Sequence, residues 1–301
     1  MGLISVKHLK KVFDKEAAVK DITFNVTEGG CTALLGPNGA GKTTTLRLLA
    51  GLLQPTGGSI RFLALKSGED QRKYIGYLPQ HPVFFNWMTA KEFLVYVGEL
   101  TGLSKRKAAG KSEELLDLLG LANAKRKSIG GFSGGMKQRL GIAQAMIHGP
   151  KLVMLDEPVS ALDPFGRREV LEMMKELKRR TTILFSTHVL HDAEEVCDDI
   201  LIINKGEIVL SGTLKNIRRQ HQQNIIKITA EANIAQWGSS LNEWSEITDI
   251  ILGDNSVTLA VKDLELARIS LIREIADKNI PVSQFVVGQS TLEDLFMRVV
   301  R

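Results

Sequence analysis

The stretch GPNGAGKT, residues 36–43, stands between an apolar run and an amphipathic run. It fits the pattern G-x-x-x-x-G-K-[ST], which forms a phosphate-binding loop where a strand leads into a helix. Its glycines let backbone N–H groups turn inward around phosphates, and the helix N-terminus adds a favourable dipole. We expect Lys42 to reach the β- and γ-phosphates of a nucleoside triphosphate, and Thr43 to bind Mg²⁺. The predicted nucleotide-binding residues are Gly36, Pro37, Asn38, Gly39, Ala40, Gly41, Lys42, Thr43 and Thr44.

Short apolar runs that end in polar residues surround this loop: CTALLG (31–36), LVMLDE (152–157) and TILFST (182–187). Such runs are typical of strands buried on both faces of a sheet. Amphipathic stretches such as KTTTLRLLAGLL and RREVLEMMKELKRR separate them, and this alternation indicates a parallel α/β sheet. Because ligands of such sheets gather at the carboxyl ends of the strands, we expect the polar residues there to form the site.

Two adjacent carboxylates follow the run LVML. Asp156 is expected to hold Mg²⁺, directly or through water, and Glu157 to orient and activate the attacking water. Neighbouring carboxylates at the end of a buried strand are costly unless a cation and hydrogen bonds balance them. Two solvated turn acids are the alternative, and the four apolar residues before them disfavour it.

His188 and Gln80 complete the candidate catalytic set with Glu157. His188 follows TILFST, where a neutral imidazole near a γ-phosphate could position the water and donate to the phosphate. Gln80 lies in YLPQHP, where its amide could sense Mg²⁺ or water, so it joins Thr43 and Asp156 as a candidate metal residue. Lone histidines and turn amides are usually structural, so both assignments depend on the neighbouring motifs.

A second element suited to anion binding, after the phosphate-binding loop, lies at SGGMKQRLGIAQAMI, residues 133–147. Ser133 can cap the following helix, and Gly134 and Gly135 then leave bare N–H groups at its first turn. An apolar residue recurs at helical spacing through the run, so one face of the helix is expected to be buried. The exposed end of this helix is therefore suited to bind an anion, but no anionic ligand from the same chain is expected there.

These motifs resemble the nucleotide-binding subunit of an ABC transporter. The matching stretches are GPNGAGKTT, YLPQ, FSGGMKQR, LVMLDEP, SALD and STH, in the family's order, over most of residues 1–215. The resemblance implies ATP and Mg²⁺ as ligands and two nucleotide domains facing each other head to tail. Ser133, Gly134 and Gly135 of one domain would then contact the γ-phosphate held by the other. Whether the pair is a homodimer or a heterodimer stays open.

The resemblance implies further roles. Phe13 would stack on adenine, where many members have tyrosine, and the segment HPVFFNWMTAKEFL would receive a coupling helix from a membrane subunit. A hydrophobic core is an equally fair interpretation of that segment. Met136 stands where the family usually has glutamine, and methionine cannot supply an amide to the partner's nucleotide. The loop that communicates across the dimer would comprise Ser160, Ala161, Leu162 and Asp163.

The predicted fold class is α/β, a P-loop ABC nucleotide-binding domain at 1–215 with a helical subdomain at about 85–145. Residues 216–301 read as β-α-β-β-α-β, which suggests a small ferredoxin-like α+β domain. Gly253, Asp254 and Asn255 predict a hairpin turn, and Ser290 with Glu293 predicts a capping box for the last helix. This part resembles the appended domain of exporter ATPases of the bacitracin, lantibiotic and daunorubicin resistance type.

Composition limits the class of protein. The 301 residues suggest two domains, and no stretch approaches the roughly 18 apolar residues of a membrane span. No signal peptide is evident, and Cys31 and Cys197 are expected to be buried, reduced thiols. The net charge is +5, but the basic clusters lack interleaved aromatics, so nucleic acid is not expected as a partner. We expect a cytoplasmic protein held at the inner face of the membrane by separate transmembrane permease subunits.

The preferred hypothesis is an ATP-hydrolysing subunit of an exporter that works by ATP-driven dimerisation. The alternative is a soluble ABC ATPase acting on nucleic acid or ribosomes. Members acting in translation usually carry two nucleotide domains, whereas this chain has one phosphate-binding loop and one signature. A third hypothesis is a regulatory subunit in which the small domain senses a ligand and gates the ATPase.

Overall fold

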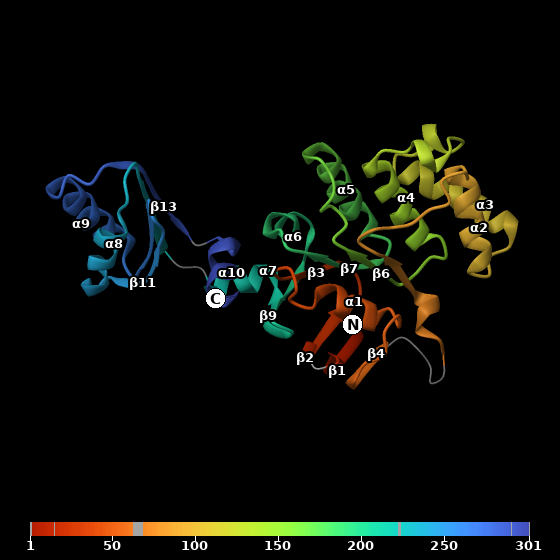
Figure 1. Ribbon diagram of the computed structural model, residues 1–301, viewed down its shortest axis with the longest axis horizontal. Helices are drawn as coiled ribbons and strands as arrows, with labels where there is room; N and C mark the ends of the chain where they lie inside the picture. Colours follow the sequence, from red (N-terminus) through yellow and green to blue (C-terminus); the bar gives the residue numbers. More distant parts are fainter. Residues whose placement is uncertain (1, 15, 63–68, 222–223, 290, 301) are drawn as a thin grey trace. The chain divides into compact units, whose positions relative to one another are not determined.

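The computed structural model describes residues 2–14, 16–62, 69–221, 224–289 and 291–300 (Figure 1). The chain forms two compact units, the first ending at Leu214 and the second beginning at Lys215. Among the helices of these residues, none has both the length and the apolar character needed to cross a bilayer.

A six-stranded sheet forms the centre of the first unit, in the order β5-β6-β7-β3-β8-β9. The first five strands are parallel, and β9 pairs antiparallel with β8. Every residue of β3, β6 and β7 is buried, which confirms the predicted buried parallel strands. The strands are β3 (Cys31–Leu35), β5 (Ile75–Leu78), β6 (Leu152–Asp156), β7 (Thr182–Thr187), β8 (Asp199–Asn204) and β9 (Glu207–Thr213).

The helices beside this sheet begin where the sequence supplies caps. Gly41 precedes α1 in the left-handed conformation. The side chain of Asp163 accepts a hydrogen bond from the backbone N–H of Gly166, and Pro164 occupies the first position of α5, where it needs no N–H partner. Helix α1 contacts β6 and β7, and α6 contacts β3 and β7. The helices are α1 (Lys42–Leu49), α5 (Pro164–Leu177) and α6 (Leu190–Val196).

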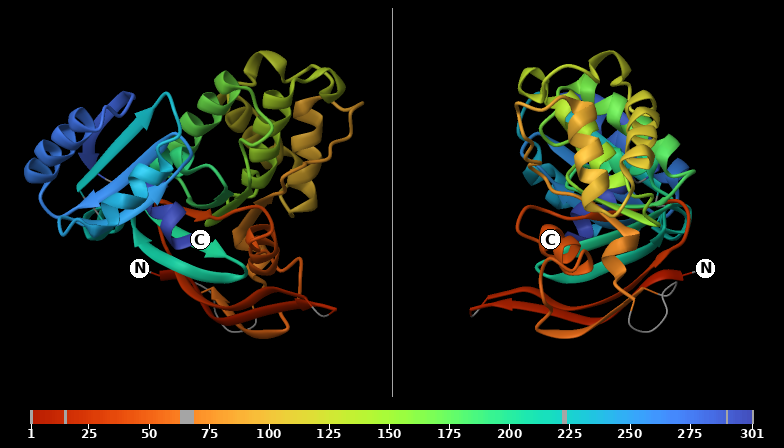
Figure 2. Two further views of the ribbon diagram at one scale, coloured as in Figure 1. Left: turned by 60° about the vertical axis from the view of Figure 1, so that its left-hand side comes forward. Right: turned by 90° about the vertical axis from the view of Figure 1, so that its right-hand side faces the viewer.

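A helical subdomain lies on one side of the six-stranded sheet, as the predicted fold class requires (Figures 1 and 2). Its three helices pack on one another, and each has a side-chain N-cap: Thr89, Ser104 and Ser133. At the first cap, Thr89 and Glu92 form a capping box. The helices are α2 (Ala90–Leu100), α3 (Lys105–Leu118) and α4 (Gly134–Met146), and short 3₁₀ turns occur at Gln71–Tyr74, Ala122–Ala124 and Ile129–Gly131.

A three-stranded antiparallel sheet on the other side of the first unit was not predicted from the sequence (Figure 2). Its long strands alternate imperfectly between buried and exposed residues, because register shifts interrupt their pairing. Their buried side chains join one core cluster with residues of α1, β3 and β6. The strands are β1 (Gly2–Phe13), β2 (Glu16–Thr27) and β4 (Gly57–Phe62).

The second unit has the predicted ferredoxin-like arrangement. Its sheet has the order β11-β12-β10-β13 with every neighbouring pair antiparallel. The backbone N–H of Gly253 donates to the carbonyl of Ser256 at 2.8 Å, which confirms the predicted hairpin turn. Helix α7 (Leu214–His221) begins at the boundary between the two units. The elements that follow it are β10 (Asn224–Ala230), α8 (Ala235–Ser240), a 3₁₀ turn (Leu241–Glu243), β11 (Ile247–Leu252), β12 (Ser256–Val261), α9 (Leu264–Asp277), β13 (Val282–Gln289) and α10 (Leu292–Val300).

The cap of α10 and the two cysteines complete the comparison with the sequence. Ser290, the predicted capping residue, lies outside the described residues. The described cap is formed one residue later, where the backbone N–H of Asp294 donates to Thr291 Oγ1 and the Asp294 carboxylate accepts from Thr291.

Cys31 and Cys197 are buried free thiols, as expected, and their Sγ atoms lie 4.0 Å apart.

Candidate functional site

A cavity of about 620 Å³ opens at the carboxyl ends of β3 and β6. It lies beside the N-terminus of α1, because the loop that follows β3 leads directly into that helix. The predicted site residues that line it are Asn38, Gly39, Gly41, Lys42, Thr43, Thr44, Gln80, Glu157, Ser160, Ala161 and His188. The fold therefore gathers the phosphate-binding loop and the candidate catalytic residues around one hollow.

Glycine is required at both ends of the phosphate-binding loop. A Cβ atom at Gly36 would lie 2.3 Å from the carbonyl oxygen of Ile203, and one at Gly41 would lie 2.5 Å from that of Ala18. Gly41 also has φ +105°, a conformation that side chains rarely adopt. The loop thus turns tightly against β8 of the six-stranded sheet and β2 of the three-stranded sheet, and it presents its backbone to the cavity.

Lys42 is a buried cation at the base of the cavity. Its Nζ donates to the carbonyl oxygens of Gly36 at 2.8 Å and Pro37 at 3.1 Å. It also lies 3.3 Å from Glu157 Oε1, and both side chains are less than 10% exposed. A buried cation needs such partners, because leaving it unpaired away from water is costly.

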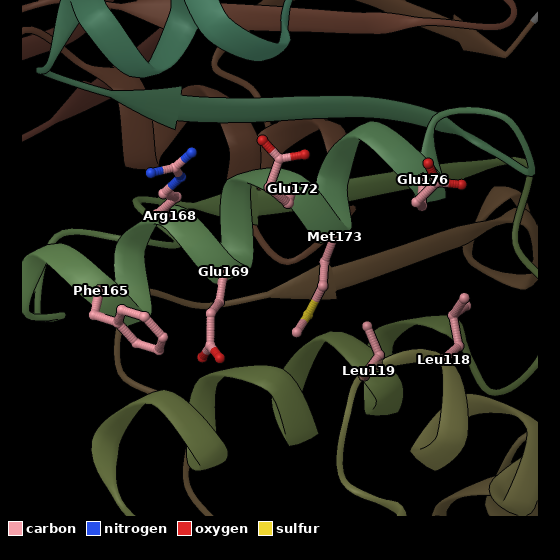
Figure 3. A pocket seen from close by; sticks show the side chains of 8 residues that line it. All are labelled: Leu118, Leu119, Phe165, Arg168, Glu169, Glu172, Met173 and Glu176. Atoms are coloured by element: carbon pink, nitrogen blue, oxygen red, sulfur yellow. The ribbon is translucent and has the colours of Figure 1, made fainter.

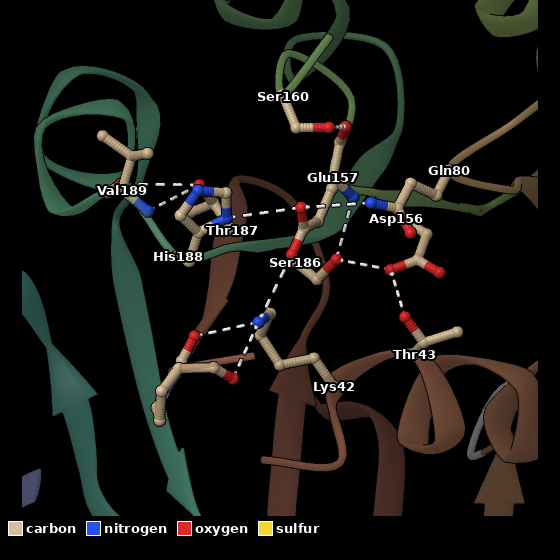
Figure 4. A network of polar contacts seen from close by, with 12 residues as sticks. Lys42, Thr43, Gln80, Asp156, Glu157, Ser160, Ser186, Thr187, His188 and Val189 are labelled. Carbon is tan, nitrogen blue, oxygen red and sulfur yellow. Dashed lines mark hydrogen bonds and ion pairs between the residues drawn. The ribbon is translucent and has the colours of Figure 1, made fainter. Parts of the chain in front are cut away.

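The candidate catalytic residues converge on the Glu157 carboxylate, as Figure 4 shows. Besides Lys42, Gln80 Nε2 donates to Glu157 Oε2 at 3.4 Å, and His188 Nδ1 lies 3.3 Å from the same oxygen. Glu157 has φ +47°, which is unusual for a residue other than glycine. Backbone strain of this kind clusters at functional sites, where the surroundings hold the residue in place.

Asp156 is almost fully buried beside Glu157, and hydroxyl groups surround it (Figure 4). Its Oδ1 accepts from Thr43 Oγ1 at 3.0 Å and from Ser186 Oγ at 2.7 Å, and its Oδ2 accepts from the Tyr77 hydroxyl at 3.4 Å. Burial first, and the Asp156 charge second, raise the pKa of Tyr77, so its hydroxyl stays protonated and donates at neutral pH.

The oxygen atoms of Asp156 and Thr43 are of the kind that bind Mg²⁺. The ion prefers oxygen ligands and usually binds through one or two carboxylates together with substrate phosphates and water. Asp156 Oδ1 and Thr43 Oγ1 are 3.0 Å apart, and Thr43 lines the cavity. In the part of the chain that the structure describes, no group of three or more His, Cys, Asp or Glu residues could hold a metal ion without such a substrate.

Ser133, Gly134 and Gly135 do not line this cavity. The Ser133 hydroxyl accepts from the backbone N–H of Met136 at 3.3 Å and so caps α4, as predicted. A Cβ atom at Gly134 or Gly135 would meet no described atom within 4 Å, and neither residue has a positive φ. Nothing described in the chain's own fold therefore requires glycine at these two positions.

Two further predicted groups lie partly away from the cavity. Ser160 and Ala161 line it, whereas Leu162 and Asp163 do not, and Asp163 instead caps α5. Phe13 ends β1 with 44% of its surface exposed, and Lys11 Nζ lies 4.9 Å from the centre of its ring. The ring is partly exposed, but it does not line the cavity described here.

Some residues of the site were not predicted from the sequence. Ser186 and Tyr77 both contact Asp156, and Ala18 lines the cavity from β2. Polar residues inside the motifs TILFST and YLPQ were the available signal for the first two. No sequence signal points to Ala18, because it reaches the cavity only through the antiparallel sheet.

A second hollow, of about 540 Å³, lies between α5 and the end of α3. Figure 3 shows Phe165, Glu169 and Met173 projecting from the side of α5 on which Leu118 and Leu119 also lie. Its lining is mostly apolar, and its charged groups include three carboxylates, which would repel phosphate. Of these two cavities, the first is therefore the one suited to a nucleotide.

Comparisons with known proteins agree with this geometry. The ABC transporter family matches residues 19–160, and the C-terminal domain of DrrA1-3-like ATP-binding proteins matches residues 212–300. The ABC transporter ATP-binding protein YxlF of Bacillus subtilis (strain 168) is 48% identical over 299 residues, which are 99% of each chain. The linearmycin resistance ATP-binding protein LnrL of the same organism is 30% identical over 99% of this chain and 98% of its own.

A solved ATP-binding subunit of an ABC transporter has a similar fold. It is 35% identical with a TM-score of 0.64, over 72% of this chain and 92% of its own. The chain therefore belongs to the ABC transporter family as an ATP-binding subunit with ATPase activity, and its DrrA-like C-terminal domain resembles that of exporter-type resistance ATPases.

Proposed function

We propose that this ATPase powers an exporter through separate transmembrane permease subunits, and that it hydrolyses ATP with Mg²⁺ only as a pair of nucleotide-binding subunits. The observation that carries the pairing is the open N-terminus of α4. Gly134 and Gly135 have free space around them, yet they do not reach the cavity of their own chain. A helix N-terminus with bare N–H groups favours phosphate, so a partner's nucleotide is the natural ligand.

Within one site, ATP binding changes the partners of two buried charges. Lys42 lies 3.3 Å from Glu157 Oε1, and the triphosphate would replace that carboxylate as its counter-charge. Glu157 would then be free to accept a proton from the attacking water, while His188 and Gln80 keep its carboxylate in place. Bound Mg²⁺ would neutralise charge on the phosphate oxygens, with Asp156 and Thr43 holding it.

Adding one methyl group at Gly135 tests the open helix end. We expect Gly135→Ala to leave the free energy of unfolding unchanged or raise it by up to about 1 kcal/mol, because alanine favours helices. We expect ATP turnover to fall at least about tenfold, because the methyl group would obstruct the approach of the partner's phosphate. Denaturant titration and a steady-state ATPase assay measure the two effects.

Gly110→Ala is the matched control. Gly110 lies inside α3, and a Cβ atom there also meets nothing within 4 Å. We expect the same gain in stability with wild-type turnover. Wild-type turnover in Gly135→Ala as well would contradict the pairing through this helix end.

Contact with a permease is supported by a patch of exposed apolar side chains before and on α2. We define this aromatic patch as Val83, Phe85, Trp87 and Tyr96, with Trp87 78% and Val83 88% exposed. The Phe85 ring lies 6.1 Å from that of Trp87 and 6.0 Å from that of Tyr96, between ring centroids. Because Phe93 of the same segment is buried, the segment is part core and part surface. Exposed apolar patches of this kind mark interaction sites.

Truncating Trp87 tests this contact. We expect Trp87→Ala to lose most association with the membrane subunit and to keep wild-type ATPase activity in the isolated chain, because the ring anchors an interface away from the nucleotide. Co-purification of an integral subunit from detergent-solubilised membranes, identified by mass spectrometry, is the measurement. Leu52→Ala, at a side chain 58% exposed elsewhere, should retain the subunit. Equal recovery with both variants would rule the patch out.

Export, rather than import, is supported by the DrrA-like match of residues 212–300 and by the resistance protein LnrL among the relatives. With its membrane subunits as separate chains, the ATPase would lie at the inner face of the cell membrane. ATP binding would favour the closed pair, and hydrolysis would reopen it.

A further inference from the structure

We propose that Ser186 is a positioning residue that holds both acids of the ATPase site in their working geometry. This inference rests on the roles proposed above for Asp156 and Glu157. Ser186 is the fifth residue of β7, directly opposite Asp156 in the register of β6 and β7, and it is fully buried. Neither the motif nor the relatives' names assign it a role.

A single hydroxyl group joins the two acids (Figure 4). Ser186 Oγ donates to Asp156 Oδ1 at 2.7 Å and accepts from the backbone N–H of Glu157 at 2.9 Å. A hydroxyl can donate and accept at once, which an apolar side chain of the same size cannot do. Both distances lie in the ordinary range of protein hydrogen bonds.

The bond to Glu157 restrains a strained residue. Glu157 has φ +47°, and its backbone N–H is buried in the sheet end. Without Ser186 this N–H loses its partner, and the backbone is free to relax toward a common conformation. The Glu157 carboxylate would then no longer be held between Lys42 and His188. Because this carboxylate is the proposed base, we expect ATP turnover to fall.

The bond to Asp156 restrains the other acid. Ser186 and Thr43 both donate to Oδ1, from two different elements of the fold. Removing Ser186 leaves Oδ1 with one described donor and allows the carboxylate to rotate. Because Asp156 is the proposed Mg²⁺ ligand, the Mg²⁺-dependent part of nucleotide binding should weaken.

The experiment measures Ser186→Ala in two ways on the full chain. We expect kcat to fall about 10- to 100-fold, because the altered position of Glu157 acts on the chemical step, and KM for ATP with Mg²⁺ to rise only several-fold, because Mg²⁺ is held less well. Independently of turnover, calorimetry of a non-hydrolysable ATP analogue should show a several-fold smaller gain in affinity from Mg²⁺ relative to EDTA. Ser186→Thr, which keeps the hydroxyl, should recover most of both properties.

The matched control is Thr182→Val at the start of the same strand. The Thr182 hydroxyl is also buried and accepts a backbone N–H, from Gly29 at 3.0 Å, but at the end of the strand away from the site. We expect Thr182→Val to lower the free energy of unfolding about as much as Ser186→Ala does, and to keep the wild-type kcat and Mg²⁺ dependence. A merely structural role for Ser186 predicts the same outcome for both variants.

The outcomes separate this inference from the proposed function. If Ser186→Ala keeps kcat within twofold and an unchanged Mg²⁺ effect while Glu157→Gln is inactive, the role of Ser186 is wrong and the function stands. If Glu157→Gln is itself active, the proposed function fails first. Failure of both Ser186→Ala and Ser186→Cys to fold would assign the hydroxyl to the fold and overturn the inference as well.

Discussion

Replacing Glu157 by glutamine should lower ATP turnover about a thousandfold and leave ATP binding intact, because the amide cannot accept a proton from water. Glutamine keeps the shape of the side chain. Lys42 retains the carbonyl oxygens of Gly36 and Pro37 as partners, so the fold should persist. ATP with Mg²⁺ should then trap the closed pair, visible as a dimer by size exclusion with light scattering. Single-turnover kinetics and nucleotide binding complete the measurement.

Glu176→Gln is the control for this substitution. It makes the same chemical change at a half-exposed glutamate of α5 whose partner, Arg179, lies 3.1 Å away. Exposed ion pairs contribute less than about 1 kcal/mol, so stability and turnover should hardly change. Wild-type turnover in Glu157→Gln would show that another group activates the water.

Mixing two inactive variants should restore hydrolysis. Lys42→Ala removes the phosphate cation of one chain, and Ser133→Arg blocks the helix end of the other. In a mixed pair both defects fall on one composite site, and the second site retains an intact loop and an intact helix end. In an equal mixture that exchanges freely, we expect up to about one quarter of the wild-type rate, because half of the pairs are mixed and each has one good site.

The controls for this experiment are each variant alone at the same total concentration and a mixture of either variant with buffer. Nucleotide binding by each variant alone is a further control. Ser133→Arg should bind nucleotide, since Ser133 does not line the cavity of its own chain, whereas Lys42→Ala should bind nucleotide poorly. No activity in the mixture above that of the separate variants would exclude sites shared between chains.

Much of this protein could be predicted from residues close together in the sequence. The spacing of Gly36, Lys42 and Thr43 indicates a phosphate-binding loop, because one turn and one helix start are enough to form it. Ser133 caps α4 as expected for the same local reason, and the order of strands and helices in the C-terminal unit predicts its sheet. The sheet of β1, β2 and β4 escaped prediction because its imperfect alternation conceals the period of a strand.

The sequence by itself determined the chemistry of the site: a phosphate loop, two acids after a buried strand, and a second helix end suited to anions. Only the tertiary structure decided how these parts meet. Strand register places Ser186 beside Asp156. The packing of α1 against β6 brings Thr43 to the same carboxylate across 113 positions of the chain and pairs Lys42 with Glu157. Such contacts depend on how strands align in a sheet and how helices pack on it, and a local pattern of residue types does not encode that arrangement.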